Sequence, residues 1–211
     1  MKAMRIFHRA LTAAALLAAT TSCGSVVRSS RSPVLLIIDS LLAVRGAASA
    51  GAATSNLSSD VLTLVTSGGV CTTASPCPTV FGDAGQAQLH LILKDIGLLG
   101  TTVAPSTNNQ VTITRVHIAY RRTDGRNQEG VDVPYAFDAA TTATVPPSGT
   151  VTVGFPLVRT QAKQSSPLIE LRTNGQVISV ICEVTLYGTD AVGNEVDVTG
   201  GINIDFGNFG D

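Results

Sequence analysis

Apolar and polar residues alternate along much of this chain, and alternation with a period of two is typical of β-strands that bury one face. Runs 150–158 and 178–187 show the pattern most clearly. Residues 34–38 are instead continuously apolar, which predicts a strand that is buried on both faces. Together the patterns predict about nine strands, over residues 33–44, 60–66, 86–93, 111–122, 131–135, 142–145, 150–158, 178–187 and 195–206.

The run 111–122 changes phase part-way along its length. Val111 and Ile113 share one parity, whereas Val116 and Ile118 share the other. Side chains of a strand alternate strictly between its two faces, so the change near residues 114–115 predicts a β-bulge or a change of sheet. The Asp-Gly pair that follows at 124–125 favours a tight turn leading into 131–135.

A short helix is expected between the seventh and eighth strands. Ser166 is a candidate N-cap, Pro167 suits the first turn, and Asn174-Gly175 is a typical end signal. With one short helix and many short strands, the economical fold is an antiparallel β-sandwich with long loop insertions.

The closing segment adds a family resemblance. Residues 177–206 resemble the final hairpin of bacterial immunoglobulin-like domains, in which an Asp-x-x-Gly-Asn turn such as Asp190–Asn194 joins two alternating strands. The resemblance implies an immunoglobulin-like sandwich and no particular activity. A minimal domain of this kind has about 100 residues, so segments 46–56, 71–85 and 122–147 are expected to be insertions.

The first residues indicate export. Lys2, Arg5 and Arg9 precede an apolar stretch, 10–19, that is too short to span a bilayer. The stretch ends in Thr20-Thr21-Ser22-Cys23, which resembles the lipobox of bacterial lipoproteins, although Thr20 stands where that family usually has Leu. An ordinary secretory signal, cut near Ala19 or Ser22 and leaving Cys23 as a free thiol, is the alternative.

The lipobox resemblance implies that residues 1–22 are removed as a signal peptide and that Cys23 receives acyl chains such as palmitate. Two or more chains give stable membrane attachment. Residues 23–33 then form a lipidated tether, and 34–211 form the sandwich domain. Gly24 and Ser25 follow Cys23 with no adjacent Asp, which resembles lipoproteins sent to the outer membrane of a double-membraned host.

The balance of charged residues limits the class of partner that is expected. Without Lys2, Arg5 and Arg9, the 14 basic residues fall to 11, against 15 acidic ones. Nucleic-acid binding needs a basic surface, so no nucleic-acid partner is expected.

The cysteines after Cys23 divide by position. Cys71 and Cys77 flank a small Gly- and Thr-rich loop, and in an exported protein they are expected to form a disulfide worth about 2–3 kcal/mol. A zinc site there would need further ligands, and no His lies nearby in sequence. Cys182 lies within a strongly apolar strand, where it is expected to behave as a small buried hydrophobe.

Catalytic and metal-binding patterns are sparse. His90 and His117 fall on polar sides of predicted strands without a third ligand beside them, and no Gly-x-Ser-x-Gly elbow is present. Calcium is the more specific alternative, because oxygen-bearing side chains gather around one turn. Its candidate ligands are Asp190, Asn194, Glu195 and Asp197.

The sequence thus predicts a non-catalytic lipoprotein of the bacterial cell envelope, anchored through Cys23 and acting as a structural, adhesive or complex-assembly module. Its expected partners are the membrane and an envelope protein, and no cofactor is expected. A lipoprotein that binds calcium or a small polar ligand is the main alternative. An envelope hydrolase would require the two histidines, or a Ser–His pair, to meet in a cleft.

Overall fold

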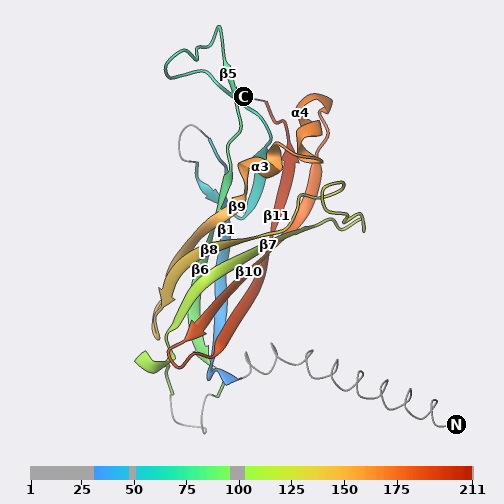
Figure 1. Ribbon diagram of the computed structural model, residues 1–211. Helices are drawn as coiled ribbons and strands as arrows, with labels where there is room; N and C mark the ends of the chain where they lie inside the picture. The colour runs from blue at the N-terminus through green and yellow to red at the C-terminus, as the bar shows by residue number, and fades with distance from the viewer. Residues whose placement is uncertain (1–30, 48–50, 96–102, 211) are drawn as a thin grey trace, which may run out of the picture.

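Two β-sheets face each other in an elongated sandwich (Figure 1). The computed structural model describes residues 31–47, 51–95 and 103–210. Cys23 and the export signal therefore lie outside the described residues. Among the described residues, no helix has the length and apolar character needed to cross a membrane.

The first sheet has four strands in the order β2-β1-β6-β9. The second has five, in the order β3-β11-β10-β7-β8, and β3 pairs with β11 in parallel whereas the other pairs are antiparallel. Their bounds are β1 Val34–Val44, β2 Ala53–Thr54, β3 Asn56–Asp60, β6 Asp83–Leu93, β7 Val111–Arg121, β8 Phe137–Val145, β9 Val151–Val158, β10 Ile178–Asp190 and β11 Glu195–Gly207.

The all-β sandwich predicted from the sequence is confirmed. The inner faces of β9 and β10 carry the alternating residues expected of them, and these side chains are buried in one apolar core with those of β6, β7 and β11. β1 packs against β11, and β8 lies beside β9, so both pairs join the two sheets. The predicted phase change in β7 is a register shift against β8 between Ile113 and Arg115.

Several strand boundaries differ from the sequence-based expectation. β1 is not buried on both faces, because its outer face carries Leu35, which is 42% exposed opposite Ile92 of β6. The expected strand over 60–66 divides into the end of β3 and a separate strand. The return strand expected over 131–135 is loop, and β8 begins only at Phe137.

The helical segment between β9 and β10 is more divided than expected. It holds two four-residue helices, α3 (Thr160–Lys163) and α4 (Leu171–Asn174), with a 3-10 helix, η2 (Leu168–Glu170), between them. Gly175 ends α4 in the left-handed conformation, with φ 63°, as its position after Asn174 predicts. Another 3-10 helix, η1 (Thr107–Asn109), precedes β7.

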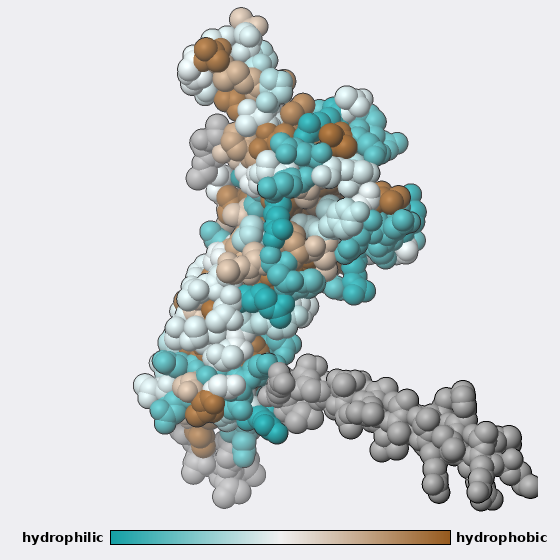
Figure 2. Space-filling model, in the orientation of Figure 1, coloured by the Kyte–Doolittle hydropathy of each residue, from teal (hydrophilic) through white to brown (hydrophobic). Residues whose placement is uncertain are grey.

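A small arm extends from the sandwich between β3 and β6. Its two strands, β4 (Thr63–Val65) and β5 (Cys77–Thr79), pair with each other as a separate sheet. The predicted disulfide between Cys71 and Cys77 is present in this arm. Val70 is 87% exposed, and apolar surface is visible at the outer end of the arm (Figure 2).

The strand directions place the connections at two opposite ends of the molecule. The start of β1 lies beside the β10–β11 turn, residues 190–195, and we call this the tether end. The other end, the loop end, holds the disulfide arm, the β7–β8 connection (122–136) and the β9–β10 connection (159–177). Figure 1 shows the two ends separated by the full length of the sheets.

Candidate functional site

Two neighbouring hollows lie at the loop end of the described chain. Both lie between the β7–β8 connection and the β9–β10 connection. Loops held by a rigid β scaffold commonly carry binding residues. We therefore take these hollows together as the candidate site.

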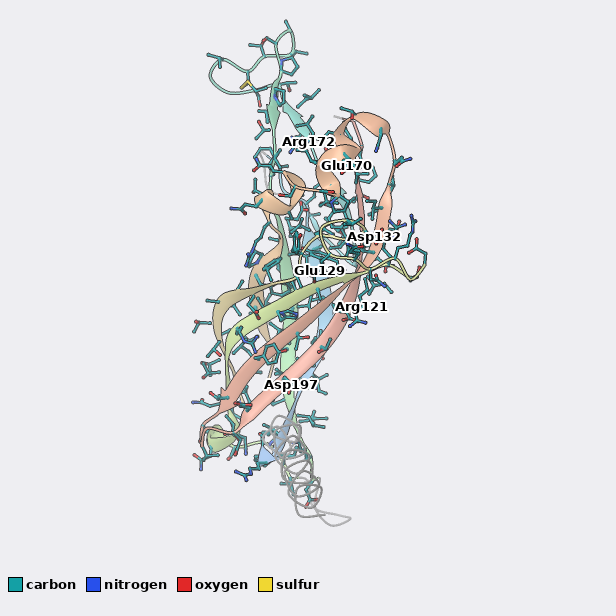
Figure 3. The ribbon with its side chains drawn as sticks, turned by 45° about the vertical axis from the view of Figure 1, so that its right-hand side comes forward. Arg121, Glu129, Asp132, Glu170, Arg172 and Asp197 are labelled. Atoms are coloured by element: carbon teal, nitrogen blue, oxygen red, sulfur yellow. A yellow bond between two sulfur atoms is a disulfide. The ribbon has the colours of Figure 1, made fainter. Side chains whose placement is uncertain are left out.

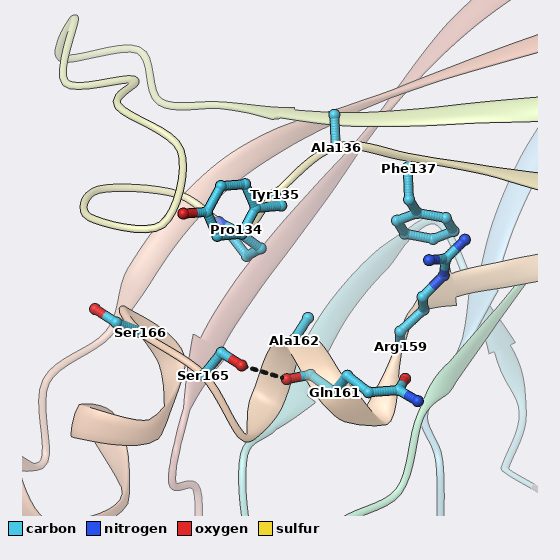
Figure 4. Close-up of a pocket in the computed structure, with 9 residues that line it drawn as sticks. All are labelled: Pro134, Tyr135, Ala136, Phe137, Arg159, Gln161, Ala162, Ser165 and Ser166. Carbon is cyan, nitrogen blue, oxygen red and sulfur yellow. Dashed lines mark hydrogen bonds between the residues drawn. The ribbon is translucent and has the colours of Figure 1, made fainter.

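The smaller hollow measures about 160 Å³ and is mainly apolar (Figure 4). The guanidinium of Arg159 stacks over the ring of Phe137, with Cζ 3.7 Å from the ring centroid. Its Nη2 also donates a hydrogen bond of 2.6 Å to the carbonyl oxygen of Asp138. These two contacts fix the arginine at the mouth of the hollow with its charge available on one side.

Tyr135 forms the outer wall of this hollow and is 63% exposed. Its ring lies against Gly130, which has a φ of 76°, and a Cβ at this glycine would overlap the tyrosine ring. The backbone of Gly130 is also fixed, because its N–H donates to the carbonyl oxygen of Val133 at 2.8 Å. The loop therefore presents a large aromatic side chain on a fixed backbone.

The larger hollow measures about 600 Å³ and is mainly polar. Arg122 and Arg126 line it and share one carboxylate: their Nη2 atoms lie 2.7 and 2.8 Å from Oδ2 of Asp124. Hydrogen bonds from the two guanidinium groups hold the pKa of Asp124 well below its usual range. Two cations share one anion here, so this side of the hollow keeps positive charge.

Acidic side chains also line this hollow. Asp132 and Glu170 line the hollow together with the polar side chains of Asn174 and Gln176. Figure 3 shows Glu129 and Asp132 on the β7–β8 connection and Glu170 on the helical segment. A surface with charges of both signs, next to an exposed aromatic residue, suits a polypeptide segment or a small polar molecule. Neither hollow is lined by a described histidine or cysteine.

The candidate calcium residues lie at the opposite, tether end. Oδ1 of Asp190 accepts hydrogen bonds from the N–H groups of Val192 (3.1 Å) and Asn194 (2.8 Å), and Oδ2 accepts one from Nδ2 of Asn194 (2.9 Å). Burial opposes the charge of Asp190, but these bonds and one from Ser32 outweigh it and hold its pKa below the usual value. The carboxylate is thus already used to close the turn.

The other two candidate ligands follow the turn on β11. Glu195 and Asp197 are exposed at the start of β11, and Figure 3 shows Asp197 on that strand far from the loop end. Among the described residues no group of three or more His, Cys, Asp or Glu side chains is placed to hold a metal ion. Calcium at the turn stays a prediction.

The two histidines do not share a site. Each lies on the outer face of a different sheet, His90 on β6 and His117 on β7, so the thickness of the sandwich separates them. Nδ1 of His90 is 2.7 Å from Oδ1 of Asp39, and Nδ1 of His117 is 3.3 Å from Oδ1 of Asp138. The cleft that a hydrolase would need from these residues is therefore not formed.

No family model matches the sequence, and no curated protein matches it significantly. The interpretation of the site therefore rests on its own residues.

Sequence reasoning located the loops of this site but not its principal side chains. The segment 122–147 was expected to be an insertion, and it supplies Tyr135 and Phe137. The usable signal in the sequence was an aromatic residue directly after Pro134, within a turn-rich segment. Arg159 gave no such signal, because only the folded chain places it over Phe137.

Proposed function

We propose that this chain is a non-catalytic module of the bacterial cell envelope, attached to a membrane by a lipid on Cys23, and that its loop end binds a protein partner. The main support for this proposal is that the two ends of the sandwich hold different features. The described chain begins at the tether end, whereas the aromatic and charged hollows lie at the loop end. We further propose that the sandwich is immunoglobulin-like, supported by the β10–β11 hairpin and its Asp190–Asn194 turn.

The distance between the two ends supports presentation of a binding surface away from the membrane. β1 alone has 11 residues, and at about 3.3 Å per residue it spans roughly 35 Å. A lipid attached nine residues before Ser32 would hold the tether end near the bilayer and leave the loop end accessible. Opposite placement of anchor and binding surface is what an adhesive or complex-assembly module requires.

The composition of the loop end favours a protein partner. Tyrosine and arginine are the side chains that most often carry binding energy in protein interfaces. Here Tyr135 is exposed, and Arg159 is held by stacking on Phe137, so Arg159 is partly pre-organised and loses little conformational entropy on binding. The mixed charges of the neighbouring hollow suit the polar rim of such an interface.

Attachment is tested by membrane fractionation of the full chain expressed in a bacterium. We expect the wild-type protein and a Ser25→Ala control in the membrane fraction, carrying a metabolically incorporated palmitate analogue. Cys23→Ala is expected in the soluble fraction without the label. Retention of Cys23→Ala in the membrane fraction would show that the anchor is not the lipid on Cys23.

Partner binding is tested by placing a photo-crosslinking amino acid at Tyr135 and, as a matched control, at the exposed Asp197 of the tether half. In native membranes we expect a discrete cross-linked species from position 135 and not from position 197. The same species from both positions, or from position 197 alone, would contradict binding at the loop end.

The alternative of a ligand-binding lipoprotein is favoured by one observation, the hollow of about 600 Å³ that is lined by both arginines and carboxylates. A ligand that binds the folded state raises its Tm by mass action. Thermal unfolding with calcium and with a panel of small zwitterions and dicarboxylates tests this function. A constant Tm across the panel would remove it.

A further inference from the structure

Charged side chains are buried where the core meets the loop end, below the candidate site. Lys163, the last residue of α3, is 0% exposed, and Asp83, the first residue of β6, is 2% exposed. Asp60, at the end of β3, is also buried and is held by Nη2 of Arg45 at 2.6 Å. Burial of three ionisable groups in a small domain is costly, so their arrangement calls for a physical reason.

The approach of Lys163 to Asp83 is unlike that of an ordinary buried ion pair. Nζ of Lys163 lies 2.8 Å from Oδ2 of Asp83, but the approach is not that of a regular hydrogen bond, and no other described group accepts one from Nζ. Buried ammonium groups are normally hydrogen-bonded, because an unsatisfied one is among the most expensive groups to enclose. The lysine is thus enclosed at contact distance from the carboxyl group of Asp83, without the full set of acceptors that a buried ammonium normally has.

The two oxygens of Asp83 have different surroundings. Oδ1 accepts a hydrogen bond of 2.8 Å from the backbone N–H of Gly46. Oδ2 faces the lysine and accepts a hydrogen bond of 2.6 Å from the hydroxyl of Ser59. A fixed N–H on one oxygen can stabilise negative charge that develops there, and a hydroxyl on the other can assist its departure.

From this arrangement we propose that Lys163 and Asp83 condense after folding to form an amide bond between Nζ and Cγ, a covalent link across the loop end of the sandwich. The ammonium first gives one proton to the carboxylate, which leaves a neutral amine beside a carboxylic acid. The amine attacks Cγ, and negative charge collects on Oδ1 opposite the Gly46 N–H. A proton from the attacking nitrogen, relayed through the Ser59 hydroxyl, leaves with Oδ2 as one molecule of water.

The buried surroundings of Lys163 and Asp83 favour this reaction. Burial lowers the pKa of Lys163, which brings the reactive free amine within reach, although attraction to Asp83 and Asp60 opposes this effect. In a dry site a neutral pair costs less than two charges. No external oxidant or activated group is needed, because the reaction only transfers protons and releases water. The same exclusion of water protects the product from hydrolysis.

The bond would join two neighbouring segments, because Asp83 pairs with Val158 at the end of β9 and Lys163 follows five residues after Val158. It would connect the start of β6 to the segment 159–177 that forms one wall of the candidate site. Because Gln161 and Ala162 of α3 line the smaller hollow, fixing Lys163 would also fix that wall. The inference does not depend on a lipid at Cys23 or on any partner.

Tryptic digestion of the folded full chain, followed by reduction and mass spectrometry, tests the bond. Trypsin cuts after Arg45, Lys94, Arg159 and Arg172, and a lysine in an amide bond is not cut. We expect a branched species that joins peptide 46–94 to peptide 160–172, with a mass lower than their sum by one water. Fragmentation should place the link between Lys163 and Asp83.

Two variants serve as matched controls. Lys163→Arg keeps a cation but has no acylable amine, and Asp83→Ala has no carboxyl group, so each should give only unlinked peptides. Free 160–163 and 46–94 peptides from the wild-type chain, with no branched species, would overturn the proposal and leave an ordinary ion pair. The wild-type digest decides alone, so poor folding of a variant cannot obscure the result.

Discussion

The hydroxyl of Tyr120 donates a hydrogen bond of 2.7 Å to the carbonyl oxygen of Leu157. Tyr120 belongs to β7 of the five-stranded sheet and Leu157 to β9 of the four-stranded sheet, so this bond crosses the core. The tyrosine is 4% exposed, and its ring meets Phe206 edge-on with centroids 5.9 Å apart. One side chain thus combines apolar packing with a specific tie between the sheets.

Replacing Tyr120 with Phe keeps the packing of the ring and removes the hydrogen bond between the sheets. The carbonyl of Leu157 then loses its partner in a buried environment, so we expect the free energy of unfolding to fall by about 1–2 kcal/mol. Urea unfolding measures this loss. Tyr187→Phe is the control, because its ring lies on the outer face of the sheet under Arg115. Equal losses in the two variants would contradict a special role for the cross-sheet bond.

The burial of Tyr120 also predicts that the folded state loses stability at alkaline pH. Burial raises the pKa of Tyr120 well above its usual value of about 10. The folded state therefore keeps a proton that the unfolded state releases once the pH passes about 10, and stability falls as the pH rises further. The advantage of the wild-type chain over Tyr120→Phe should shrink between about pH 10 and 11. A constant difference in that interval, measured by urea unfolding, would contradict this linkage.

How far the sequence predicts the fold is visible in two strands. In β10 a strict alternation from Ile178 to Leu186 was sufficient, because each apolar side chain reaches the same core. β7 was predictable even in its irregularity, since strict alternation makes any phase change a physical signal. Local pattern succeeds where burial of one face alone decides the structure.

The sequence-based predictions fail where a charged residue that is distant in the sequence determines the local structure. The strand expected over 60–66 breaks because Asp60 turns inward to Arg45 and also accepts the N–H of Leu62, which starts the arm. No pattern in the sequence places Lys163 beside Asp83. The candidate site was predictable only as a set of insertions, because its stacking and charge sharing depend on contacts between separate loops.

The disulfide between Cys71 and Cys77 is expected to stabilise the arm locally rather than the whole domain. The arm strands β4 and β5 pair with each other and form a sheet separate from the sandwich. The arm can therefore open while the core stays folded, and the loss of about 2–3 kcal/mol expected from chain entropy would apply to the arm alone. Hydrogen exchange of Cys71→Ser/Cys77→Ser should rise within 63–79 and stay unchanged in β10. A large drop in the global Tm would show that the arm is coupled to the core.

Replacing Asp190 with Ala tests whether the turn at the tether end depends on its carboxylate. The variant leaves the N–H groups of Val192 and Asn194 without their acceptor, so in chelator we expect a loss of about 1–3 kcal/mol. Asp197→Ala, in the same hairpin but exposed, should change stability by less than about 0.5 kcal/mol.

The pKa of Asp190 is lowered in the folded state, so its contribution to stability is present above about pH 4 and is lost as the pH falls through the folded value. The difference between wild type and Asp190→Ala should therefore narrow in acid. A difference that persists undiminished at low pH would mean that side-chain packing, rather than the charged turn, accounts for the loss.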